Sequence, residues 1–250
     1  MVHGYSILVT KKLPINHSNN LDLVTNLDLS FVMLKIKEIN FDSFEYLNNL
    51  EALNLSNNLL TKLDFRTFAF LYKLKNLHLN NNLLTILDPN ILRSNSNLEN
   101  LSFSYNFISD LHSDIFSTLV NLRSLSLDHN QLKTLSCDTF RTMSNLVCMN
   151  LNDNQLKSID LNLFVMCSNL ETLNLNNNKI TELHRDTFRS LKKLKYLNLS
   201  QNKLENLNFQ IFSYLENLRF LYLLNNRLND LNPVKFHLPR GCFVDLNNQI

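Results

Sequence analysis

The chain has 250 residues and a formal net charge of +2, from 24 basic and 22 acidic residues. Hydrophobic residues make up 44% of it, and 2 glycines and 4 prolines are too few for a disordered or linker-rich protein. Because the only glycines are Gly4 and Gly241, the chain cannot form a glycine-rich phosphate loop or a dinucleotide-binding fingerprint. The balanced charge also gives no general electrostatic case for binding nucleic acid.

The first residues lack the features of a secretory signal. The apolar segment 7–9 is too short, and the basic pair Lys11 and Lys12 follows it instead of preceding it. No apolar run is long enough to cross a bilayer. The four cysteines, at 137, 148, 167 and 242, show neither metal-site spacing nor the clusters of a disulfide cap. We therefore expect a cytoplasmic protein, and an extracellular one if an upstream segment is missing.

The chain begins with two irregular segments. Residues 1–25 hold no complete repeat, and their apolar residues predict a partial cap. Residues 26–49 form a degenerate unit with two possible registers. One register uses Leu29, Phe31 and Leu34, whereas the other uses Leu27 and Leu29 and needs two extra residues. Terminal units of repeat arrays are usually atypical in this way.

From residue 50 to residue 241 the sequence repeats itself every 24 residues in eight regular units. The shared pattern is LxxLxLxxNxLxxLxxxxFxxL, and its first leucine defines position 1 of each repeat. The repeats begin at Leu50, Leu74, Leu98, Leu122, Leu146, Leu170, Leu194 and Leu218. Position 19 is Phe68, Phe116, Phe140, Phe164, Phe188, Phe212 and Phe236, with Leu92 as the one substitute. Residues 242–250 form a truncated unit, in which Val244 and Leu246 predict one more strand.

This pattern resembles the leucine-rich-repeat proteins, specifically their 24-residue type, over residues 26–250. The resemblance implies an α/β right-handed solenoid with a parallel β-sheet on the concave face and short helical or irregular turns on the convex face. The residues agree with it: in the segment Leu173-Asn174-Leu175, alternation points two leucines inward and one asparagine outward, as in a strand. One repeat cannot bury its own leucines, so each must stack on its neighbours.

Position 9 is asparagine in all eight regular repeats. A side-chain amide can donate and accept hydrogen bonds at the same time, which the buried backbone groups of a stacked turn require. We therefore interpret these residues as a structural ladder: Asn58, Asn82, Asn106, Asn130, Asn154, Asn178, Asn202 and Asn226.

The last two regular repeats carry the most distinctive outward residues. Tyr196, Phe220, Tyr222 and Leu224 occupy positions 3, 5 and 7, which point to the concave side. Aromatic residues clustered in a concavity are typical anchors of a protein interface. We interpret this patch as a partner-binding site; the alternatives are that the C-terminal unit folds over it as a cap, or that it mediates self-association.

A second candidate contact region lies midway along the array. Tyr105, His129 and Asp153 occupy position 8 of successive repeats, and Asp128 precedes His129. Strand spacing brings His129 and Asp153 within reach of a hydrogen bond. Cys148 faces the same side but lies about five residues along the chain from Asp153, too far for a catalytic triad. The pattern therefore predicts a polar contact region.

Position 10 changes from apolar to basic along the array. It reads Leu59, Leu83, Phe107, Gln131, Gln155, Lys179, Lys203 and Arg227. Its basic end would suit an acidic partner segment near the C-terminal repeats, and a solvated rim is the alternative.

These features together predict a non-enzymatic module that binds a protein partner on its concave face. We expect no cofactor, no metal ion, no nucleic acid and no membrane. The alternatives are the recognition ectodomain of a secreted or surface receptor-like protein, and an adaptor that recruits targets to a larger complex. Glycosylation sequons at Asn16, Asn54, Asn100 and Asn198 argue against secretion, because three of them would place glycans on the concave sheet.

Overall fold

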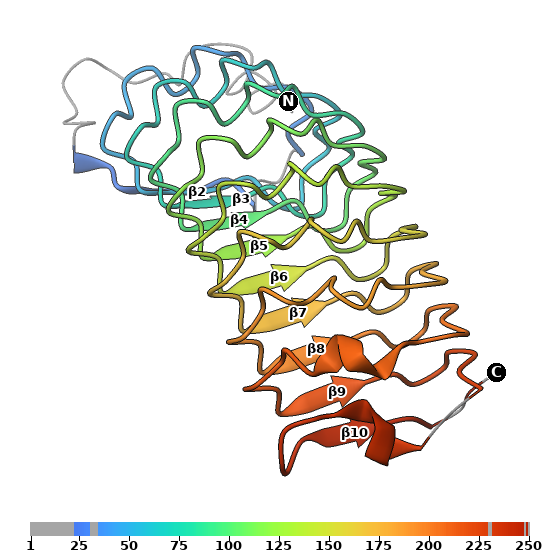
Figure 1. The fold of residues 1–250 in the computed structure, drawn as a ribbon. Helices are drawn as coiled ribbons and strands as arrows, with labels where there is room; N and C mark the ends of the chain where they lie inside the picture. The colour runs from blue at the N-terminus through green and yellow to red at the C-terminus, as the bar shows by residue number, and fades with distance from the viewer. Residues whose placement is uncertain (1–22, 31–34, 230–231, 248, 250) are drawn as a thin grey trace.

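The computed structural model describes residues 23–30, 35–229, 232–247 and 249. The chain winds into a solenoid of stacked turns, and each turn contributes one short strand to a single sheet (Figure 1). The predicted cap in residues 1–25 lies outside the described residues, apart from its last three positions.

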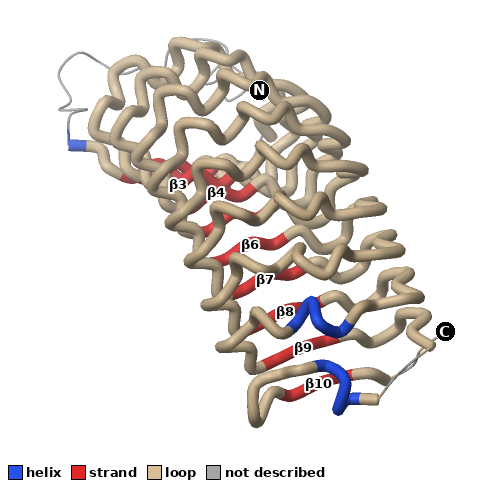
Figure 2. Tube along the Cα trace, viewed as in Figure 1, coloured by secondary structure: helices blue, strands red, loops and turns tan. Residues whose placement is uncertain are grey.

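The sheet has ten parallel strands in the order of the chain, β1 to β10, so every strand pairs with the next one in sequence. Each strand is three residues long. Their bounds are β1 Asn26–Asp28, β2 Ala52–Asn54, β3 Asn76–His78, β4 Asn100–Ser102, β5 Ser124–Ser126, β6 Cys148–Asn150, β7 Thr172–Asn174, β8 Tyr196–Asn198, β9 Phe220–Tyr222 and β10 Phe243–Asp245. Strands occupy one side of the solenoid and turns the other (Figure 2). This confirms the predicted solenoid class.

The repeat pattern sets the register of the sheet. Position 4 leucines face each other across the strands, as Leu53 does with Leu77, and they are buried. The residues on either side, at positions 3 and 5, point outward and are half-buried or exposed. This outward side of the sheet is the concave face.

The first unit adopts the second of its two predicted registers. Leu27 pairs with Leu53 in the sheet, which makes Leu27 the position 4 residue. The backbone N–H of Ile36 donates to Oδ1 of Asn58 at 2.9 Å, so the two extra residues of this register fall between Leu29 and Ile36. Phe31 and Leu34, which define the other register, lie outside the described residues.

The C-terminal unit adds the strand that the sequence predicted. Val244 pairs with Leu221, and Leu246 follows directly after β10. Gln249 then makes the bonds of a ladder residue: its amide donates to the carbonyls of Leu223 and Leu246, at 3.0 and 2.9 Å. The 24-residue pattern did not predict this role, although Gln249 lies three residues after Leu246, as position 9 does after position 6.

A column of buried phenylalanines fills the core behind the sheet. Phe116, Phe140 and Phe164 stack on one another with ring centroids 6.3 and 6.5 Å apart. Leu92 takes the same position between Phe68 and Phe116, and it is also fully buried. The convex turns are mostly irregular, with 3₁₀ helices at η2 Phe209–Phe212 and η3 Pro233–Phe236. The core therefore runs along the whole stack.

Candidate functional site

The asparagines at position 9 hold neighbouring turns together. The Nδ2 group of Asn130 donates to the carbonyls of Phe103, Leu127 and Asp128, at 2.9, 3.1 and 3.2 Å. Its Oδ1 accepts the backbone N–H of Ile108 at 3.0 Å. The amide thus satisfies backbone groups of its own repeat and of the repeat before it, and it is buried. The other seven asparagines make the same kind of bonds.

Position 8 has a left-handed backbone conformation in all eight regular repeats, with φ between 50° and 58°. Four of these residues are asparagine, which tolerates this conformation better than most side chains. They are Asn57, Asn81, Asn177 and Asn225. Part of the asparagine content of the chain therefore has a conformational cause. The conformation turns the side chains of position 8 to the concave edge, where the central candidate residues lie.

The central candidate residues form one connected cluster. The rings of Tyr105 and His129 are stacked, with centroids 3.9 Å apart. Nδ1 of His129 lies 3.1 Å from Oδ2 of Asp128, and its Nε2 lies 3.4 Å from Oδ2 of Asp153, which confirms the predicted proximity. The carboxylate of Asp128 is buried and also accepts the hydroxyl of Ser104 at 2.5 Å. We call Tyr105, Asp128, His129 and Asp153 the central cluster.

The aromatic residues of the last strands also meet on the concave face. The rings of Tyr196 and Tyr222 lie 5.2 Å apart, and the ring of Tyr222 lies 5.9 Å from that of Phe243. The ring centroids of Phe220 and Phe243 lie 6.4 Å apart, and these two side chains are 44% and 52% exposed. We call Tyr196, Phe220, Tyr222, Leu224 and Phe243 the aromatic patch.

Phe243 is the member of the patch that the repeat pattern did not predict, because it belongs to the irregular last unit. Strand β10 extends the sheet beside β9 and does not fold over the patch. Leu224 is half-buried at the edge of the patch, and its carbonyl accepts the N–H of Gln201 at 2.7 Å. The described part of the last unit thus enlarges the exposed aromatic surface instead of capping it.

Two rims, at positions 2 and 10 of the repeats, lie before and after the strands of the concave face. At position 2, acidic and basic residues of neighbouring repeats form ion pairs: Lys75 with Glu51 at 2.9 Å, and Lys195 with Glu171 at 2.7 Å. Arg219 follows at the same position, and in the described part of the chain it forms no ion pair. Position 10 forms the opposite rim, with exposed Leu59, Leu83 and Phe107 at one end and exposed Lys179, Lys203 and Arg227 at the other.

The remaining cysteine and histidine side chains described here have structural environments that indicate no catalytic or metal-binding role. Burial raises the pKa of the Cys167 thiol to about 12, so this thiol stays protonated and unreactive at neutral pH. Cys148 is exposed on β6. Nδ1 atoms of His112 and His184, both at position 15, accept the N–H two residues later at 3.2 Å and cap the convex turn. Within the described residues, no group of His, Cys, Asp and Glu side chains could hold a metal ion.

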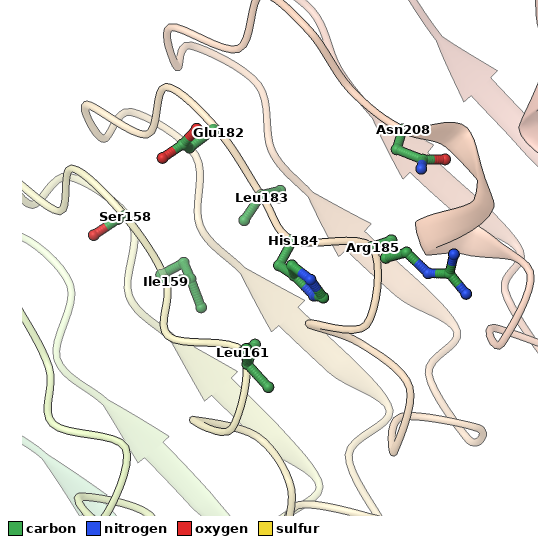
Figure 3. A pocket seen from close by; sticks show the side chains of 8 residues that line it. All are labelled: Ser158, Ile159, Leu161, Glu182, Leu183, His184, Arg185 and Asn208. Carbon is green, nitrogen blue, oxygen red and sulfur yellow. The ribbon is translucent and has the colours of Figure 1, made fainter.

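A hollow of about 520 Å³ lies away from the concave face, between the turns of three successive repeats (Figure 3). Ser158, Ile159 and Leu161 of one repeat line it together with residues of the next two. A second hollow of about 440 Å³ uses the corresponding positions one repeat further along, around Leu207 and Phe209. We interpret both as grooves that the stacking of the turns creates, since they recur with the repeat.

The Leucine rich repeat family model matches this chain four times, over residues 22–84, 72–132, 121–180 and 168–228. The chain therefore belongs to the leucine-rich-repeat family. None of the curated protein sequences that were compared matches it.

Solved structures share the fold. TLR13 in its complex with ssRNA13 is similar at 26% identity with a TM-score of 0.78, over 90% of this chain and 32% of TLR13. A leucine-rich-repeat protein of Leptospira interrogans is similar at 32% identity with a TM-score of 0.77, over 88% of this chain and 54% of that protein. Toll in its Drosophila complex with Spatzle is 21% identical with a TM-score of 0.71, over 87% of this chain and 35% of Toll, which shows the fold alone.

The chain thus spans between about one third and just over one half of the length of these proteins. The fold is typical of protein–protein interaction modules and of receptor ectodomains, which are generally non-enzymatic. Among the residues that the structure describes, no helix has both the length and the apolar character that a membrane span needs.

Proposed function

We propose that this chain is a non-enzymatic interaction module that holds a protein partner on its concave face, with the aromatic patch as the main contact. The observation that carries this proposal is a group of four aromatic rings, from three neighbouring strands, on the solvent side of the sheet. Phe220 and Phe243 are exposed, and Tyr196 and Tyr222 are half-buried. Most repeats of this fold bury their phenylalanine in the core column. A group of aromatic rings on the surface is instead typical of an interface.

The central cluster is proposed as a second contact region on the same face. Tyr105 is 49% exposed and keeps a left-handed backbone with φ of 53°, a conformation that is uncommon for a bulky side chain. His129 and Asp153 present polar atoms beside it. A partner that lies along the sheet from the aromatic patch would reach these residues and gain hydrogen bonds.

The test is affinity capture with the intact chain as bait, followed by mass spectrometry of the retained proteins. A first variant changes Tyr196, Phe220, Tyr222 and Leu224 to serine. A matched control changes Asn80 and Asn176, half-buried residues at position 7 of other repeats, to serine. Circular dichroism must first show that both variants are folded. We expect the control to retain the partner and the first variant to lose it; a partner that binds both variants equally contradicts the proposed site.

We also propose a cytoplasmic location, with a secreted or surface receptor as the alternative that the structural likeness to TLR13 favours. Three sequon asparagines lie on strands of the concave face. Asn100 donates to Oδ1 of Asn76 at 2.7 Å, and Asn54 and Asn198 accept the N–H of a serine two residues later. Glycans at these positions would disrupt these bonds and cover the sheet. Mass spectrometry of the natural protein should find them unmodified, whereas the receptor alternative predicts glycans.

A further inference from the structure

We infer that the aromatic patch selects an acidic peptide segment that carries an apolar or aromatic anchor residue. This inference rests on the proposed function and specifies the chemistry of the partner. Its basis is the charge of the two rims at this end of the concave face, together with the arrangement of the rings between them.

Arg219 supplies the cation on the first rim. Earlier along this rim, an acidic and a basic residue of neighbouring repeats neutralise each other, as Glu171 and Lys195 do at 2.7 Å. Position 2 of the next unit is Cys242, which offers no carboxylate, and Arg219 has no ion pair within the described residues. Its side chain is exposed, and its carbonyl accepts the N–H of Phe243 at 2.8 Å. The backbone of Arg219 is therefore hydrogen-bonded to the backbone of Phe243, which has the most exposed ring of the patch.

Lys203 supplies the cation on the opposite rim. It is exposed and forms no ion pair with any described residue. The adjacent Arg227 shares its charge with Glu205 at 3.5 Å. Lys203 follows Gln201 by two residues, and the N–H of Gln201 donates to the carbonyl of Leu224 in the patch. The apolar surface thus lies between two cations that lack ion-pair partners, and partner carboxylates would complement them.

The rings favour a peptide over single-stranded nucleic acid. Bases stack on flat aromatic faces that follow one another along a positively charged groove. Here the ring planes are tilted by 42° between Tyr196 and Tyr222, and by 56° between Tyr222 and Phe243. Asp245, which pairs with Tyr222 across the sheet, adds a negative charge beside the patch. A phosphate chain is repelled there, whereas a peptide can place an N–H at Asp245 and its carboxylates at the rims.

The experiment is a selection from a displayed random-peptide library on the intact chain, followed by fluorescence anisotropy with the enriched peptides. Two double variants are compared with the unchanged chain: Phe220→Ser with Phe243→Ser, and Arg219→Glu with Lys203→Glu. All four side chains are exposed, and circular dichroism checks that each variant is folded. A labelled oligouridine serves as the single-stranded RNA probe.

We expect the enriched peptides to be acidic with an apolar anchor, and each double variant to weaken their binding by about tenfold or more. Raised salt should weaken binding to the unchanged chain, and the charge-reversed variant should enrich basic peptides instead. Enriched peptides without acidic residues that still need Phe220 and Phe243 would overturn this inference and leave the proposed function standing.

The remaining outcomes would contradict the proposed site or the proposed class of ligand. Peptides that bind the Phe220→Ser, Phe243→Ser variant as well as the unchanged chain would overturn both the inference and the proposed site. No enrichment at all, or tight oligouridine binding that Arg219 and Lys203 control, would overturn the choice of an acidic peptide.

Discussion

The central and C-terminal parts of the concave face have the same backbone but opposite surface properties. In the central part, polar side chains contact one another: Asp128 accepts the hydroxyl of Ser104, and Asp128 and Asp153 both lie beside the ring nitrogens of His129. In the C-terminal part, the rings of Phe220 and Phe243 are exposed and Arg219 has no ion pair within the described residues. The outward positions of this repeat are therefore not needed for the fold, so each part of the array can carry its own surface.

What the two parts share is the internal scaffold. Buried leucines, the column of phenylalanines and the ladder amides run through both, from Asn58 to Gln249. Substitution of a scaffold residue should therefore lower the stability, whereas substitution of a surface residue should not. Stability here means the free energy of unfolding from urea titrations followed by circular dichroism.

The largest effect is expected for Phe140→Ala. Phe140 is fully buried and stacks on Phe116 and Phe164, so its loss should lower the stability by about 3–5 kcal/mol. Phe220→Ala removes the same side chain from the concave face and should change the stability by less than about 0.5 kcal/mol. Similar losses for the two variants would mean that the aromatic patch belongs to the scaffold.

Asn130→Ala should lower the stability by about 1–3 kcal/mol, because it leaves buried carbonyls and one buried N–H without a partner. Asn80→Ala is the control, since its half-buried side chain makes no hydrogen bond within the described residues. Asn54 is a poorer control, because its Oδ1 accepts from the N–H and the hydroxyl of Ser56. Equal unfolding midpoints for Asn130→Ala and Asn80→Ala would contradict the ladder.

A smaller effect, and in the opposite direction, is expected for Gln201→Asn, which should raise the stability. Gln201 has a left-handed backbone with φ of 55°, and asparagine tolerates this conformation better. The stability should rise by about 0.5–1 kcal/mol. The reverse change at the same position of the next repeat, Asn225→Gln, should lower it by a similar amount. If both changes are neutral, the left-handed conformation does not explain the asparagines at position 8.

The smallest effect is expected at the charged rim. Glu171→Gln removes the ion pair with Lys195, which is well exposed, and should lower the stability by about 0.5 kcal/mol at low salt. Arg219→Gln should leave the stability unchanged, since Arg219 has no ion pair among the described residues. A clear loss for Arg219→Gln would show that this side chain supports the fold and is not available to a partner.

The scaffold of this protein is predictable from its repeat pattern. Period, strand positions, buried leucines and ladder asparagines recur every 24 residues, and each copy repeats the same local pattern of polar and apolar side chains. The outward direction of Tyr196, Phe220 and Tyr222 followed from the alternation of a strand. Such features depend only on contacts with the neighbouring repeat, which has leucine, asparagine and phenylalanine at the same pattern positions. The pattern therefore contains both sides of each contact.

Features that occur once were not predictable from the repeat pattern and depend on the folded stack. The pairing of Val244 with Leu221 fixed the register of the last unit, and with it the places of Phe243 and Gln249. The pairing of Leu27 with Leu53 chose between two registers that the sequence left open. The physical reason is that a degenerate unit has several apolar alignments of similar quality. Hydrogen bonds to the adjacent regular repeat select one of them, and those bonds exist only in the folded stack.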